Sequence, residues 1–126
     1  MSPSPSKPKN SARIFAEGAG RRGEMWAELF LFIKGYRTIA RRVKTPVGEI
    51  DLIARRGSMT VFVEVKARSF SHQEADALMA VNRHRIVRAA QMWLMRRPEL
   101  AAGDTRFDVI FLAPFAWPRH IVNAFQ

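Results

Sequence analysis

The chain has 126 residues, of which 48% are hydrophobic, and this is enough for one domain with a core of moderate size. Disulfides, cysteine nucleophiles and thiolate zinc sites are excluded because the chain contains no cysteine. A net charge of +10 suggests a polyanionic partner, with nucleic acid first and an anionic membrane surface second. No apolar run approaches the ~18 residues of a membrane span, and no signal peptide is visible, so we expect a soluble cytoplasmic protein without membrane insertion.

Residues 1–12 are mostly Ser, Pro and Lys, which predicts a disordered basic tail followed by a single domain over residues 13–126. Residues 18–23 (GAGRRG) match the pattern G-x-G-x-x-G. No strand precedes this segment and no acidic residue follows at the required distance, so we do not expect a dinucleotide site. A basic lead-in to the next helix is the better interpretation.

Residues 23–34 (GEMWAELFLFIK) predict a helix that ends at Gly35. Apolar side chains cover nearly its whole circumference, which is typical of a buried helix. Glu24 and Glu28 share the one polar strip, and on a buried helix they would need a cation or a phosphate–lysine cluster as a partner. A strip that is simply the hydrated edge of the helix is an equally good interpretation.

Residues 36–44 predict a strand, and residues 48–66 predict a β-hairpin whose two-residue loop, Gly57-Ser58, suits a type II′ turn. Counting outward from the loop pairs Arg56 with Met59, Ile53 with Phe62, Asp51 with Glu64, and Glu49 with Lys66. Alternation then assigns one face to the core, formed by Ile50, Leu52, Val61, Val63 and Val65. The other face carries Ile53, Phe62 and the four charged residues Glu49, Asp51, Glu64 and Lys66.

The second hairpin face suggests a metal site. Asp51 and Glu64 would repel each other across the strands. A divalent cation between them would turn this repulsion into a net attraction, since oxygen ligands suit Mg²⁺ or Mn²⁺. Lys66 projects from the same face and could reach a phosphate or an attacking water. The spacing is equally compatible with a solvated face that carries a Glu49–Lys66 ion pair, although two large apolar neighbours argue against full exposure.

Residues 67–72 predict a loop, and residues 73–97 predict a helix that is broken near Asn82 and turns Ile86, Ala90, Trp93 and Leu94 to the core. Its basic side chains form either a solvated face or a face that contacts phosphates: Arg83, His84, Arg85, Arg88, Arg96 and Arg97. A helix of this length suits a crossover, so residues 106–113 predict a strand parallel to residues 60–66. The last residues predict a short strand or turn that covers an edge. The histidines at 72, 84 and 120 show no ligand spacing.

Four segments, in order, resemble the YraN-like branch of the PD-(D/E)XK nuclease superfamily: residues 20–24 (GRRGE), 48–53 (GEIDLI), 61–68 (VFVEVKAR) and 106–110 (RFDVI). The resemblance spans about residues 18–125. It implies an α/β fold with a three-layer α/β/α restriction-endonuclease-like core and a mixed central sheet, together with Mg²⁺-dependent phosphodiester cleavage. It also implies that Asp51 and Glu64 are metal ligands, that Lys66 orients water or stabilises charge, and that Glu24 completes the site.

Two residues depart from the superfamily pattern. Ile50 stands where the superfamily has a proline, and Asn82 stands where the next helix often has a lysine or glutamine, so a positive charge is missing there. We expect a Mg²⁺- or Mn²⁺-dependent endonuclease-like protein that acts on DNA rather than RNA, including branched or processed DNA. The residues expected to contact nucleic acid are Arg68, Asn82, Arg83, Arg85 and Arg88.

Two other functions stay open. One is a non-catalytic nucleic-acid-binding module on the same fold, and the other is an accessory protein of an RNA- or ribosome-linked pathway. Nucleases of this class that cut both strands often form homodimers, but nothing in the sequence identifies an interface.

Overall fold

A computed structural model of the protein describes residues 23–66, 72–113 and 116–124, with only the backbone for residues 72–82. These residues form a five-stranded sheet of order β1-β2-β3-β4-β5. The strands are β1 (Arg37–Thr45), β2 (Gly48–Arg56), β3 (Met59–Lys66), β4 (Asp104–Phe111) and β5 (Arg119–Ile121). β3 and β4 are parallel and the other neighbours are antiparallel, so the sheet is mixed.

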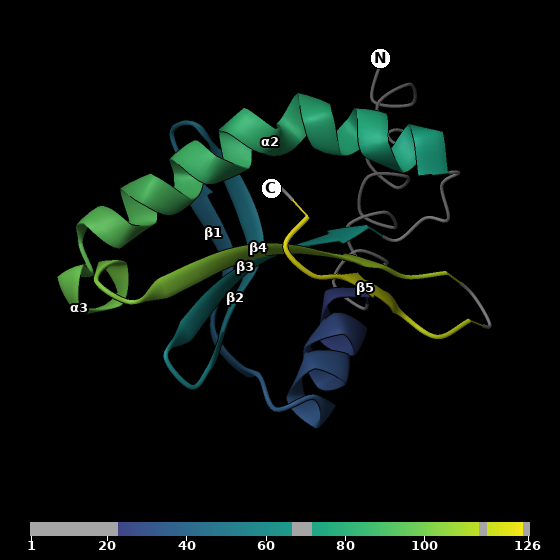
Figure 1. The fold of residues 1–126 in the computed structure, drawn as a ribbon, viewed down its shortest axis with the longest axis horizontal. Helices are drawn as coiled ribbons and strands as arrows, with labels where there is room; N and C mark the ends of the chain where they lie inside the picture. Colours follow the sequence, from purple (N-terminus) through teal and green to yellow (C-terminus); the bar gives the residue numbers. More distant parts are fainter. Residues whose placement is uncertain (1–22, 67–71, 114–115, 125–126) are drawn as a thin grey trace, which may run out of the picture.

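Helices cover both faces of the sheet (Figure 1). A helix over residues 23–33 lies on one face, and α2 (His72–Met95) lies on the other, followed by the short α3 (Pro98–Ala101) that leads into β4. The predicted three-layer α/β/α architecture with a mixed sheet is therefore confirmed. No helix among the described residues is long and apolar enough to cross a membrane.

The helix over residues 23–33 ends as predicted. Gly35 has φ +94°, a conformation that favours glycine. Its N–H donates to the carbonyl oxygen of Phe32 at 3.0 Å, and the N–H of Tyr36 donates to that of Leu31 at 2.9 Å. This pair of bonds is the Schellman arrangement, which satisfies carbonyl groups that the helix would otherwise leave without partners.

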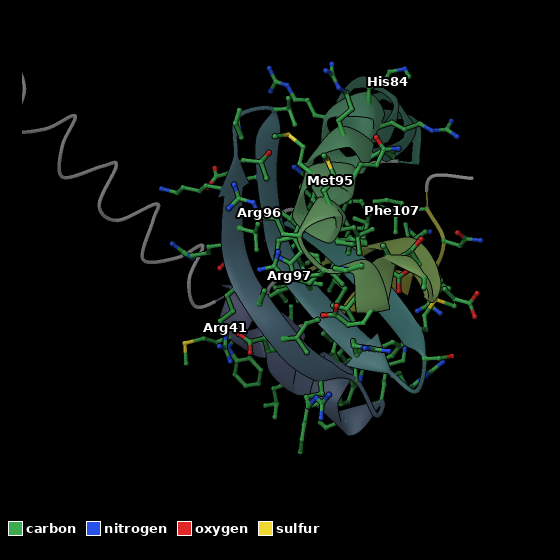
Figure 2. All side chains as sticks on the ribbon, turned by 90° about the vertical axis from the view of Figure 1, so that its left-hand side faces the viewer. Arg41, His84, Met95, Arg96, Arg97 and Phe107 are labelled. Carbon is green, nitrogen blue, oxygen red and sulfur yellow. The ribbon has the colours of Figure 1, made fainter. Side chains whose placement is uncertain are left out.

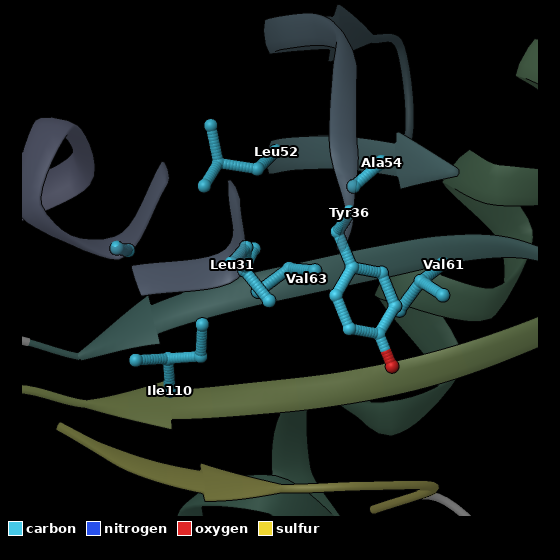
Figure 3. Packing of buried hydrophobic residues seen from close by; sticks show 8 residues of the cluster. Leu31, Tyr36, Leu52, Ala54, Val61, Val63 and Ile110 are labelled. Carbon is cyan, nitrogen blue, oxygen red and sulfur yellow. The ribbon is translucent and has the colours of Figure 1, made fainter. Parts of the chain in front are cut away.

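The prediction that this helix is buried nearly all round is wrong. Ala27 and Leu31 are fully buried against the sheet (Figure 3). The opposite side is exposed and carries five large apolar residues: Met25, Trp26, Leu29, Phe32 and Ile33. The physical reason is that an outer layer has a sheet on one side only, so a helix that is apolar all round leaves half of its apolar surface uncovered.

The hairpin loop and its first pairs are also as predicted. Gly57 has φ +61° and Ser58 does not have a positive φ, as a type II′ turn requires. Arg56 pairs with Met59 and Ile53 pairs with Phe62. The register therefore follows from the loop over the first half of the hairpin.

The assignment of Ile50 to the same face as Leu52 is wrong. Leu52 packs below the helix of residues 23–33, whereas Ile50 joins Ile53 and Phe62 in the cluster beneath α2. Regular alternation fails at this end of β1 and β2, where Arg42 has φ +49° and no Arg42–Asp51 pair forms between Arg41–Leu52 and Val43–Ile50. A left-handed residue inside a strand changes the direction of its neighbours, and the sequence pattern does not show it.

The crossover helix α2 runs without a break, so the predicted interruption near Asn82 is wrong. Its core residues Ile86, Ala90 and Trp93 are buried as expected. β4 begins opposite Met59 and runs parallel to β3, and β5 pairs with its outer edge. Both of these predictions are confirmed.

A buried carboxylate ties β4 to β5. The side chain of Asp108 is fully buried and accepts hydrogen bonds from Arg106 Nε and Nη2 at 2.8 and 2.7 Å, from His120 Nε2 at 2.7 Å, and from the Asn123 N–H at 2.9 Å. Lys34 Nζ lies 2.6 Å from His120 Nδ1. An ammonium can only donate, so the imidazole proton sits on Nε2 and points to Asp108. Burial alone would raise the pKa of Asp108, but these hydrogen bonds outweigh it and lower the pKa to about 2.

We predict that Asp108→Asn destabilises the fold by roughly 3–5 kcal/mol, because it leaves the Arg106 guanidinium without its counter-charge in a largely buried position. Chemical denaturation at neutral pH measures the difference. Asp104→Asn is the matched control, since Asp104 is exposed on the same strand, and it should change the free energy of unfolding little.

The pH dependence gives a second measurement of the same contact. A folded-state pKa of about 2, against an ordinary value of 3.8, stabilises the fold at pH values above about 4. That stabilisation is lost as the pH falls toward 2. Asp108→Asn should therefore show a shallower loss of stability than the wild type over this range, and parallel curves would contradict the assignment.

Candidate active site

The candidate site lies where β2 and β3 separate. Their ladder ends at the pair Leu52–Val63, although both strands continue, and the predicted pairs Asp51–Glu64 and Glu49–Lys66 do not form in it. Beyond this point the Val65 N–H donates to Asp51 Oδ2 at 2.8 Å. The Asp51 side chain therefore takes the hydrogen-bonding role that the β2 backbone has elsewhere in the hairpin.

Asp51 lies in an unfavourable position for a negative charge. The pKa of Asp51 is raised to about 6, chiefly by burial and in smaller part by the carboxylates of Glu64 and Glu24. The hydrogen bond from the Val65 N–H and the charge of Lys66 act in the opposite direction, but by less. The predicted residues Glu24, Asp51, Glu64 and Lys66 are therefore close enough to act on one another electrostatically.

Glu64 and Lys66 form an ion pair beside Asp51. Lys66 Nζ lies 2.7 Å from Glu64 Oε1, and the two side chains are 26% and 15% exposed. Lys66 therefore pairs with Glu64. The solvated-face interpretation required an ion pair between Lys66 and Glu49 instead. The ammonium is held at the site and is still partly open to solvent, where a water or a phosphate oxygen could reach it.

Both glutamates of the N-terminal helix pair with neighbouring arginines of β1. Arg42 Nε donates to Glu24 Oε2 at 2.8 Å, and Arg41 Nε donates to Glu28 Oε2 at 2.7 Å. The hydrogen bond to Glu28 raises the pKa of Arg41. Adjacent strand residues normally point to opposite faces, and the left-handed φ of Arg42 coincides with the departure from that rule.

The donor set fits an oxygen-liganded divalent cation. Glu64 and Glu24 lie within electrostatic range of Asp51 near the point where the strands separate, and carboxylate oxygens are the ligands that Mg²⁺ and Mn²⁺ prefer. The raised pKa of Asp51 indicates that negative charge at this point is not compensated. Within the described part of the chain, however, no three acidic or histidine side chains converge as ligands. Arg42 and Lys66 hold the two flanking carboxylates instead.

The basic side chains of α2 and of the residues that directly follow it divide into two groups. A Cβ placed on Gly48 would lie 3.6 Å from Arg85 Cβ, so this part of α2 rests against the first residue of β2, three positions before Asp51. Arg83, Arg85 and Arg88 are exposed there. Arg96 and Arg97 lie toward α3, at the other end of the helix (Figure 2), and Arg97 stacks on Trp93 with its guanidinium carbon 4.0 Å from the ring centre.

Two of the predicted nucleic-acid contacts are not described. Arg68 lies outside the described residues, and only the backbone of Asn82 is described, as part of α2. Of the three histidines, His120 belongs to the Asp108 network and has the core role that the absence of ligand spacing indicated.

Comparison with known proteins identifies the family. A family model described as "Uncharacterised protein family UPF0102" matches residues 23–112. The chain belongs to the UPF0102 family. This is the YraN-like member of the PD-(D/E)XK nuclease superfamily that the sequence motifs indicated.

Relatives in the UPF0102 family match along most of the chain. A UPF0102 protein of Bradyrhizobium sp. strain BTAi1 is 46% identical over 122 residues, which cover 97% of this chain and 90% of the relative. A UPF0102 protein of Methylorubrum extorquens is 46% identical and covers 97% and 95%. A third, from Parvibaculum lavamentivorans, is 49% identical over 107 residues, which cover 85% and 80%.

Sequence reasoning missed Arg41, Arg42 and the Val65 N–H as parts of this UPF0102 site. The two arginines are adjacent on β1, where regular alternation would place them on opposite faces, so nothing in the sequence pairs both with the helix. No signal in the sequence showed that the hairpin ladder would stop before Asp51, because the residue pattern continues beyond it.

We predict that Asp51→Asn leaves the metal-free protein as stable as the wild type, or more stable by up to ~1 kcal/mol, because it removes a poorly compensated charge while keeping an acceptor for Val65 N–H. Mn²⁺ should stabilise the wild type by ~2.7 kcal/mol at a hundredfold excess over its Kd. It should stabilise Asp51→Asn much less. Thermal melts in EDTA and in Mn²⁺ measure both effects, and an equal Mn²⁺ shift in the two proteins would remove Asp51 from the metal site.

Proposed function

We propose that this UPF0102 protein is a metal-dependent endonuclease that hydrolyses phosphodiester bonds in DNA, including branched or processed DNA. The observation that carries the proposal is the hydrogen bond from the Val65 N–H to Asp51. It fixes a half-buried carboxylate within electrostatic range of Glu64, Glu24 and Lys66. An arrangement with three acids and one lysine around a strand separation is suited to binding a cation and a phosphate together.

The proposed roles follow from the contacts. Asp51 and Glu64 would hold Mg²⁺ or Mn²⁺, with Glu24 at the border of the site. The bound ion would activate water and stabilise the charge that develops on the phosphoryl group. Lys66, already positioned by Glu64, would donate a hydrogen bond to the water or to a phosphate oxygen. Arg42, on β1, donates a hydrogen bond to Glu24 and holds that side chain in place.

The charge distribution supports DNA as the substrate class. The exposed arginines of α2 and β1 contribute to the net charge of +10. Arg83, Arg85 and Arg88 are exposed on the part of α2 that rests against Gly48, three positions before Asp51. Phosphate contacts of this kind supply affinity without sequence preference.

We predict that the protein cleaves DNA only with Mg²⁺ or Mn²⁺, and that Asp51→Asn, Glu64→Gln and Lys66→Ala each lower the rate by roughly 100-fold or more, since each removes a group that acts on the reacting phosphate or its cation. The assay compares duplex, single-stranded and branched DNA with RNA of the same sequence. Glu49→Gln is the matched control, because it removes one negative charge from an exposed position of the same strand, and it should cleave like the wild type. Full cleavage by Asp51→Asn and Glu64→Gln would refute the proposed site.

A second candidate function is a nucleic-acid-binding module without catalysis. The observation in its favour is that Glu24 and Glu64 each form an ion pair with a neighbouring cation, Arg42 and Lys66 respectively. Such pairs would be enough to keep the fold intact without a cofactor. Binding measured in EDTA separates this function from cleavage.

We predict that DNA binding in EDTA is strongly salt-dependent and that changing Arg83, Arg85 and Arg88 together to Gln reduces the log–log salt slope by up to about 2.7, at roughly 0.9 for each phosphate contact. Arg37→Gln is the control, since Arg37 is an exposed arginine outside α2, at the first position of β1. An unchanged slope in the triple variant would exclude this part of α2 from the binding surface.

A further inference from the structure

The outer side of the N-terminal helix forms an apolar face that no described element covers (Figure 1). At the helical spacing of 100° per residue, its side chains span an arc of about 120°. Trp117, which is 87% exposed, extends the face from the connection between β4 and β5. We call this set the apolar helix face: Met25, Trp26, Leu29, Phe32, Ile33 and Trp117, exposed by 48 to 87%.

The apolar helix face contains a hollow. A cavity of about 620 Å³ lies between the helix and the β4–β5 connection, and Trp26, Leu29, Ile33 and Trp117 contribute to its lining. Met25 and Phe32 are 67% and 71% exposed and do not line it. The face therefore has exposed apolar side chains both inside and outside the hollow, so a two-fold axis could bring side chains of one copy to the hollow of the other.

Charge is kept off the apolar helix face. The charged residues of helix residues 23–33 are Glu24 and Glu28, and both point to arginines of β1. Two chains of net charge +10 repel each other through most of their surfaces. An uncharged face is where two copies of such a chain can approach closely.

We propose that this face is a homodimer interface, in which the helices of two copies pack antiparallel across a two-fold axis near Leu29. Aromatic side chains present roughly 150–250 Å² when fully exposed, and the Met, Leu and Ile side chains of the set lie near the lower end of that range. Six side chains with these exposures therefore offer on the order of 700 Å² per chain, close to the ~800 Å² that each partner contributes to a standard interface. Leu29 is the central member of the helical set, with Met25 and Trp26 on one side and Phe32 and Ile33 on the other.

The same face is less suited to a membrane surface. A helix that lies in a lipid interface carries Lys and Arg along its polar side. The polar positions of residues 23–33 are instead two glutamates already paired with arginines. A second copy brings an identical apolar surface and no additional charge, so the observations favour self-association.

The test is the mass of the full chain in solution by light scattering, after nucleic acid has been removed at high salt. The wild type is expected to be a dimer, and Phe32→Glu and Trp26→Glu are expected to be monomers because they place a charge in the interface. Met95→Glu is the matched control, since Met95 is 80% exposed on α2, across the sheet from the helix, and it should stay dimeric. Thermal melts confirm that each variant is folded.

A second measurement is independent of those substitutions. The chain contains no cysteine, so Leu29→Cys introduces a single thiol, and an antiparallel pair centred there brings the two thiols within disulfide distance. Mild oxidation should link Leu29→Cys into dimers and leave Met95→Cys as monomers. A wild type that is monomeric at tens of micromolar would overturn the proposal. So would equal cross-linking of the two cysteine variants, or a wild-type monomer that sediments with neutral phospholipid vesicles.

Discussion

The hydrogen bond from the Val65 N–H to the Asp51 carboxylate is the contact on which the candidate site depends. It forms because the ladder between β2 and β3 ends after Leu52–Val63, so that a strand N–H is paired by a side chain rather than by the neighbouring backbone. In this arrangement Asp51 lies within electrostatic range of Glu24, Glu64 and Lys66. Without it, Asp51 would be an ordinary cross-strand neighbour of Glu64 on one face of a regular hairpin.

The carboxylates of Asp108 and Asp51 have pKa values that their surroundings shift in opposite directions. Asp108 receives hydrogen bonds from a guanidinium, an imidazole and a backbone amide, and its pKa falls to about 2. Asp51 receives one backbone N–H among the described residues, and burial raises its pKa to about 6. Environments that move two similar groups in opposite directions usually mark different roles. Asp108 holds β4 and β5 together, whereas Asp51 carries a charge that a ligand could compensate.

The N-terminal helix has three different surfaces, each with its own partner. Ala27 and Leu31 face the sheet and hold the helix in place. Glu24 and Glu28 face β1, where two consecutive arginines pair with them. The remaining apolar residues face outward. One short helix can therefore complete the core, border the proposed site and present a surface for association, because its residues are divided around the helix axis.

The sequence by itself determined the elements that depend on local chemistry: the II′ loop at Gly57-Ser58 and the register it sets as far as Ile53–Phe62, the helix end at Gly35, the parallel placement of β4, and the family to which the motifs belong. It also selected Glu24, Asp51, Glu64 and Lys66 as one group. Only the tertiary structure decided where the hairpin ladder stops, that Arg42 adopts a left-handed φ and pairs with Glu24, that Ile50 packs beneath α2, and that half of an apolar helix stays exposed. Loops and helix ends are set by residues a few positions apart, whereas these other features depend on which distant surfaces meet, and periodicity along the chain carries no information about that.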